Sequence, residues 1–328
     1  MSDWFRADLR IAFLIVAAAL GCAETLPSAP AASAGVRASA DDSDLWNLAP
    51  VAADTVAEID LSAMRTSPWT RSLMESGLSG QREQSRRAYG YDPFTDADRL
   101  LAVAVETGSA PRELTVLRGR FDATQVGAAF ASAKGQVAAT RWRDSPVWEA
   151  GGRAVALVTP RTLVTGGPAD VRAAIDAAWG VVPDAKTGPL GELRRAMAAD
   201  RDNPAAFVAV TVTEALRARA AGFLALPAGL QRFAARIDLG QDLNMELTGA
   251  ADTAANAAAA ANALVTAARS YAQGTMVRLL GLSPVLNSLS VGAEGTRLHG
   301  HVQIPVEQRE RLADKVLAVL QMLAATRH

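Results

Sequence analysis

Alternating apolar and polar residues in the C-terminal half constrain the fold of this chain most strongly. The alternation runs through residues 234–239, 243–250, 288–293 and 296–304. A short glycine-containing turn joins the first segment to the second, and another joins the third to the fourth. A period of two places successive side chains on opposite faces of a strand, and turns of this kind join antiparallel neighbours. The sequence therefore predicts two β-hairpins, each with one apolar and one polar face.

The pattern of elements in the C-terminal half occurs a second time earlier in the chain. Residues 55–179 and residues 207–325 each predict the order β-α-β-β-α-β-β-α. We therefore expect an α+β fold of duplicated β-α-β-β-α-β-β-α units, with mainly antiparallel sheets and helices packed on one face. A loop containing Pro183 suggests the boundary, which gives one repeat over 45–183 and another over 184–328.

Local signals mark where several helices begin. Asp122 and Asp252 stand where a capping side chain is expected, and Pro168 suits the first turn of a helix. The alanine-rich stretch after Asp252 predicts a thin helix that lies close to a sheet. Residues 306–325 predict an amphipathic closing helix.

The N-terminus carries a short apolar run, residues 11–20, followed by Gly21 and Cys22. A membrane-spanning helix needs roughly 20 apolar residues, so the run suits the hydrophobic core of a signal peptide. A plain secretion signal and an uncleaved anchor are the alternatives. Cys22 is the only cysteine of the chain.

The residues Ala19-Leu20-Gly21-Cys22 resemble the lipobox of bacterial lipoprotein signal peptides, with leucine one place later than in Leu-Ala-Gly-Cys. The resemblance implies a signal peptide over 1–21 and acyl chains such as palmitate on Cys22, which would anchor the protein to a membrane of the cell envelope. Alanine instead of aspartate at position 23 favours the outer over the inner membrane. Residues 22–44 are rich in Ala, Ser and Pro and predict a disordered tether.

Composition and missing motifs exclude several classes of function. A net charge of −1 on 328 residues gives no reason to expect a nucleic-acid partner. With Cys22 acylated, no thiol remains for a disulfide, a thiolate metal site or a nucleophile. The segment Gly77-Leu78-Ser79-Gly80 is not a nucleophile elbow, and no zinc-protease motif occurs. We therefore predict a protein that is not an enzyme and uses no cofactor or metal.

The polar faces of the C-terminal hairpins supply the candidate binding residues. The apolar side chains expected in the core are Ile237, Leu239, Leu243, Met245, Leu247, Leu289, Val291, Leu298, Val302 and Ile304. The outward candidates for binding are Arg236, Asp238, Glu246, Arg297, His299 and His301. Such a face is either simply solvated, a surface for a partner protein or glycan, or buried between the two halves. His299 and His301 share a face, so a carboxylate such as Glu246 or Asp238 would complete a metal site; exposed histidines are the simpler interpretation.

Two other clusters have structural and functional interpretations. Asp92, Asp96 and Asp98 crowd one turn but lack the pattern of a calcium loop, which favours turn and capping chemistry. The tryptophans at 142, 148 and 179 suit either core packing or a sugar-binding cleft. The turn from Gly90 to Asp96 loosely resembles uncharacterised bacterial envelope proteins.

These features together predict a lipid-anchored envelope protein that works by binding or scaffolding through an open polar sheet face. The partners would be a membrane at Cys22 and an envelope protein or glycan. The first alternative is a carrier that holds an apolar ligand between the alanine-rich helices and the sheet. A hydrolase without a recognised motif is the second alternative.

Overall fold

The computed structural model describes residues 44–71, 79–106, 112–132, 137–198, 204–221, 226–279, 281 and 283–308. The predicted signal peptide, Cys22, most of the tether and nearly all of the closing helix lie outside these residues. The described chain forms two compact units, one of residues 44–62 and 79–192 and another of residues 63–71 and 193–308. None of the helices seen in the described part is both long and apolar enough to cross a membrane.

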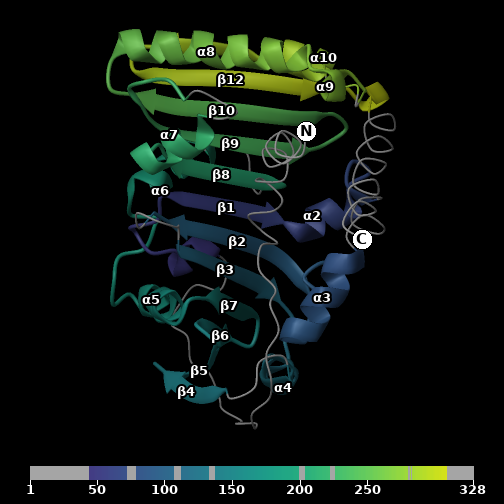
Figure 1. Cartoon of the computed structure of the whole chain (residues 1–328), viewed down its shortest axis with the longest axis vertical. Helices are drawn as coiled ribbons and strands as arrows, with labels where there is room; N and C mark the ends of the chain where they lie inside the picture. Colours follow the sequence, from purple (N-terminus) through teal and green to yellow (C-terminus); the bar gives the residue numbers. More distant parts are fainter. Residues whose placement is uncertain are drawn as a thin grey trace. The chain divides into compact units, whose positions relative to one another are not determined.

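The first unit is built on an antiparallel sheet of strand order β1-β2-β3-β7-β6-β5-β4. Helices lie before, between and after these strands in the sequence, and two of the helices begin in this unit and end in the other (Figure 1). Its strands are β1 (Thr55–Asp60), β2 (Ala97–Val105), β3 (Arg112–Gly119), β4 (Ala138–Trp142), β5 (Ser145–Ala150), β6 (Arg153–Thr159) and β7 (Thr162–Gly166). Its helices are η1 (Leu45–Leu48), α2 (Leu61–Thr66), α3 (Ser79–Tyr89), α4 (Ala123–Ser132), α5 (Pro168–Ala178) and α6 (Pro189–Ala198).

The second unit contains an antiparallel sheet of strand order β8-β9-β10-β12-β11. Its strands are β8 (Ala206–Thr211), β9 (Leu230–Leu239), β10 (Leu243–Ala251), β11 (Ser290–Glu294) and β12 (Arg297–Ile304). Its helices are α7 (Glu214–Ala220), α8 (Ala254–Ala272), α9 (Thr275–Leu279), α10 (Ser283–Asn287) and η3 (Val306–Gln308). Both sheets confirm the predicted α+β class and the antiparallel pairing.

Capping side chains explain where the helices begin. Asp122 accepts hydrogen bonds from the backbone N–H groups of Thr124 at 2.7 Å and Gln125 at 3.1 Å, and Pro168 opens α5. Both starts were expected from the sequence and are confirmed. The start of α8 differs by one residue, because Thr253 is the cap and Asp252 instead accepts a bond from the Asn256 side chain.

The core of the second unit depends on small residues in α8. Ala257, Ala260 and Ala261 pack with Leu230 and Leu298, so the helix lies close to the sheet as predicted. In Figure 1, α8 runs alongside β12. An irregularity in the β9–β10 register near Ala251 turns Leu230 onto this apolar face.

Helices meet both faces of this sheet, and the expectation that they lie on one face only is wrong. The helix α8 covers the apolar face, whereas the C-terminal end of α6 reaches the polar face, where Met197 accepts a hydrogen bond from Arg236. The first unit also departs from the eight-element pattern, because four strands follow α4 where the pattern has two.

The turn between β4 and β5 has an uncommon backbone. Arg143 and Asp144 both have positive φ angles, 47° and 64°, although neither is glycine. Two consecutive left-handed residues form the tight turn whose twist matches that of a two-stranded ribbon. The turn holds Trp142 and Ser145 opposite each other at the end of the hairpin.

Candidate binding surface

Four exposed side chains along β12 form the centre of the candidate surface. Arg297, His299, His301 and Gln303 are exposed, whereas the alternating residues Leu298, Val302 and Ile304 are buried. We call the four exposed residues the β12 polar row. The predicted alternation along this strand is therefore confirmed, and its polar side faces solvent.

The neighbouring strand β10 continues this polar face. Its residues Thr248 and Glu246 lie directly opposite His299 and His301 in the register of the two strands. Directly opposed residues have Cβ atoms about 4.5–5.5 Å apart, so the carboxylate of Glu246 belongs to the same surface as the imidazoles. Asp242, in the turn before β10, accepts a hydrogen bond from Gln303 at 2.6 Å.

The chemistry of this surface suits recognition of a polar or anionic partner. The guanidinium of Arg297 and two imidazoles offer donors along one line, and Glu246 offers acceptors beside them. Within the described residues, no group of three or more His, Cys, Asp or Glu side chains is placed to hold a metal ion.

Arg236 does not belong to the open surface, although the sequence predicts it there. Only 2% of the residue is exposed. Its Nε lies 2.9 Å from Oδ2 of Asp238, and its Nη1 donates a 3.1 Å hydrogen bond to the carbonyl of Met197 at the end of α6. Arg236 and Asp238 are thus a structural ion pair that fastens α6 to β9. The open polar face is therefore confined to β10, β12 and the edge strand β11.

A second surface lies at the C-terminal end of α5, and Trp142 is the one member of it that the sequence indicated. The exposed large apolar residues of the described chain are Val51, Trp142, Val181 and Val182, between 36% and 52% exposed. Asp176 of α5 joins two of them, since its Oδ1 accepts from Trp142 Nε1 at 3.1 Å and its carbonyl accepts from the Val181 N–H at 2.8 Å. We call these four residues the Trp142 patch.

The patch has a signal in the sequence that is visible only in retrospect. Val181 and Val182 stand between Gly180 and Pro183, in a loop where apolar side chains have no strand or helix to bury them. Of the two tryptophans of the β4–β5 hairpin, Trp148 is buried against Gly127, whereas Trp142 is exposed.

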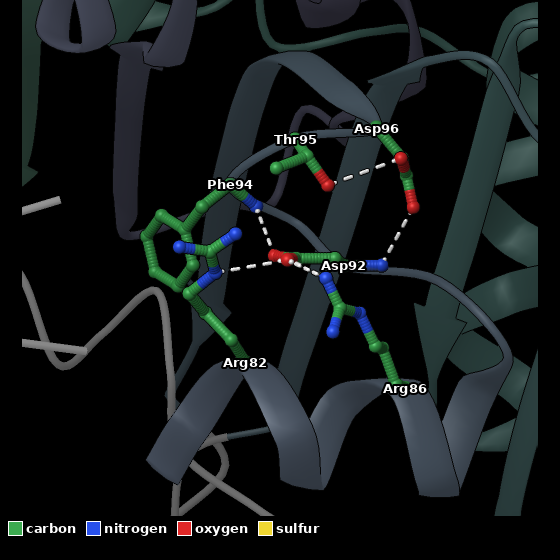
Figure 2. A network of polar contacts seen from close by, with 6 residues as sticks. All are labelled: Arg82, Arg86, Asp92, Phe94, Thr95 and Asp96. Atoms are coloured by element: carbon green, nitrogen blue, oxygen red, sulfur yellow. Dashed lines mark hydrogen bonds and ion pairs between the residues drawn. The ribbon is translucent and has the colours of Figure 1, made fainter. Parts of the chain in front are cut away.

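The Asp92 turn is structural, as turn chemistry predicts. Asp92 is fully buried, and its Oδ2 lies 2.9 Å from both Nε of Arg82 and Nη2 of Arg86 on α3. Its Oδ1 accepts from the Phe94 N–H at 3.0 Å, while Asp96 accepts from the Asp92 N–H at 2.8 Å (Figure 2). These contacts fasten α3 to the turn before β2 and confirm the turn interpretation for Asp92 and Asp96.

The neighbouring Tyr91 is buried in an aromatic cluster. Its ring meets Phe121 edge-on with centroids 5.4 Å apart, and Tyr89 lies 5.9 Å away. Burial raises the pKa of the Tyr91 hydroxyl well above its ordinary value of 10.0, and Tyr89 adds to this rise.

The raised pKa of Tyr91 predicts a loss of stability in alkali. Above about pH 10 the unfolded chain releases the Tyr91 proton while the folded chain keeps it, so the free energy of unfolding falls as the pH rises. Replacing Tyr91 with phenylalanine should make this fall shallower. Urea titrations of both proteins from about pH 8 to about 11 measure the slope. Identical slopes for the two proteins would contradict the prediction.

Comparison with known proteins finds similarity in fold alone. No protein-family model matches the chain, and no curated protein matches it. Among solved structures, crystal form III of TP0453 is similar with a TM-score of 0.52 and 12% sequence identity, covering 84% of this chain and 98% of that one. Crystal form IV of TP0453 has a TM-score of 0.50 at 12% identity, covering 84% and 96%. At this identity the likeness extends to the α+β architecture and not to a site.

Proposed function

We propose that the chain is a lipid-anchored cell-envelope protein that works by binding a partner through the polar face of β10 and β12. The observation that carries the proposal is the β12 polar row, whose side chains are exposed while the opposite side of the same strand is buried. The lipobox-like residues before Cys22 support the anchor, and Ala23 supports the outer membrane. The partner we propose is an envelope protein or a glycan that offers anionic or hydrogen-bonding groups.

We also propose that the two units are copies of one ancestral unit. Their strand orders support this, since β1-β2-β3-β7-β6 in the first unit corresponds to β8-β9-β10-β12-β11 in the second. In both, the last strand of the series returns to lie beside the third. The hairpin of β4 and β5 would then be an addition to the first copy.

The anchor is tested by substituting the cysteine. Cells fed an alkyne analogue of palmitate should label the wild-type protein, and Cys22→Ser should remove the label and release the protein from sedimented membranes. Circular dichroism of the purified variant checks that it still folds. A variant that stays unlabelled but fractionates like wild type would overturn the lipid anchor.

The binding surface is tested by photo-crosslinking in intact cells. A photoreactive amino acid at His301 should yield a discrete crosslinked species, and the same amino acid at Thr266, exposed on α8, serves as the matched control. Combining Arg297→Ser with His299→Ser should weaken the crosslink from position 301 at least about tenfold, because two contacts near a partner are removed. Equal crosslinking from both positions would overturn the proposal.

A further inference from the structure

We propose that the Trp142 patch rests on the lipid surface of the membrane and thereby sets which side of the first unit faces it. The inference rests on the proposed lipid anchor at Cys22. It concerns a different surface from the β12 polar row, so the two proposals make separate predictions.

The chemistry of the patch is that of a membrane interface. The Trp142 ring is exposed, while its N–H is already bonded to Asp176, so the ring can enter an apolar layer without leaving a donor unsatisfied. The Arg172 guanidinium lies 5.4 Å from the centre of this ring, and Arg143 pairs with Asp176. Tryptophan beside arginine is typical of the headgroup region, where the aliphatic stem is covered and the charge stays hydrated.

The path of the chain favours a membrane as the occupant of this surface. The η1 helix, immediately after the tether, packs against α5. Pro50 then bridges to Asp184, and the Val51 N–H donates to the Pro183 carbonyl at 3.2 Å. The tether therefore joins the folded unit beside the patch.

The number of residues between Cys22 and the first unit limits how far the patch can lie from the proposed anchor. Residues 23–44 separate Cys22 from η1, and a chain of 22 residues has a fixed maximum length. An apolar contact on the same side of the protein adds to the attachment that the acyl chains at Cys22 provide and limits how the first unit can turn on the membrane.

A fluorescent label on the patch tests the proposal with the full acylated protein in vesicles of phosphatidylethanolamine and phosphatidylglycerol. Cys22 is the only cysteine, and acylation blocks it, so Val182→Cys introduces a single reactive thiol for an environment-sensitive dye. We expect blue-shifted emission, stronger by about threefold or more, when vesicles are added. The same dye at Ala128→Cys, exposed on α4 of the same unit, should not respond.

A second set of variants separates the patch from the anchor. With the dye at Val51→Cys, adding Val181→Asp and Val182→Asp should reduce the response about tenfold, because two apolar contacts become charged. If the protein floats with the vesicles but the emission of the dye at position 182 does not change, the membrane contact of the patch is wrong and the lipid anchor stands. If the protein carries no acyl chains but the dye emission still responds to vesicles, the lipid anchor is wrong and the membrane contact of the patch stands. A response that grows with protein concentration in the absence of vesicles shows contact between copies and overturns the membrane assignment.

Discussion

Replacing Asp92 with alanine is expected to lower the free energy of unfolding by about 3–4 kcal/mol. The carboxylate is fully buried and holds Arg82, Arg86 and the Phe94 N–H together. Its removal leaves the partly buried Arg82 guanidinium and a backbone donor without their acceptor. Arg86 is more exposed and recovers much of its loss through water.

Two further variants make this prediction specific. Asp92→Asn keeps the shape and an acceptor for Phe94 but loses the negative charge, so it should destabilise by about 2 kcal/mol. Asp98→Ala, in the same aspartate cluster, removes a more exposed carboxylate that pairs with Arg161 at 3.5 Å, and should cost about 0.5 kcal/mol. Urea unfolding followed by circular dichroism compares all three. If Asp92→Ala were no more destabilising than Asp98→Ala, the network would be unimportant for stability.

Replacing Arg236 with alanine should lower the free energy of unfolding by about 3 kcal/mol. The change empties the volume of a long buried side chain, separates Asp238 from its partner and releases the end of α6. Arg236→Met keeps most of the volume and should recover about 1 kcal/mol of this loss.

The matched control for Arg236 is Arg297→Ala, which removes an exposed arginine from β12. We expect it to leave the urea midpoint nearly unchanged and to weaken partner crosslinking. Arg236→Ala should instead lower the midpoint strongly. Equal midpoints for the two variants would show that the buried pair does not stabilise the sheet.

Much of the fold could be predicted because its determinants are local. The β9–β10 and β11–β12 hairpins follow from a period of two and a short turn, and α4 and α5 follow from Asp122 and Pro168. The cap of α8 was misplaced by one residue, since Asp252 and Thr253 are both good capping residues and only the backbone geometry decides between them.

The candidate site could be predicted only in part because burial depends on distant segments. Along β9, Arg236 follows the same alternation as the exposed residues of β12. The residues next to it in the sequence do not indicate that the end of α6 packs over it. The Trp142 patch could not be predicted from the sequence for a related reason. Its members come from three segments that lie far apart in the sequence, and hydrogen bonds to Asp176 and Pro183 help to bring them together.

The turn at Arg143 and Asp144 has a consequence for how the first unit can engage a surface. Left-handed geometry at two non-glycine residues costs backbone energy, and Arg143 of this turn also pairs with Asp176 of α5. The same pair and the indole hydrogen bond hold Trp142 at one rotation of its ring. Contact through this hairpin therefore requires little loss of side-chain freedom, because the ring and its neighbouring cation are already preorganised.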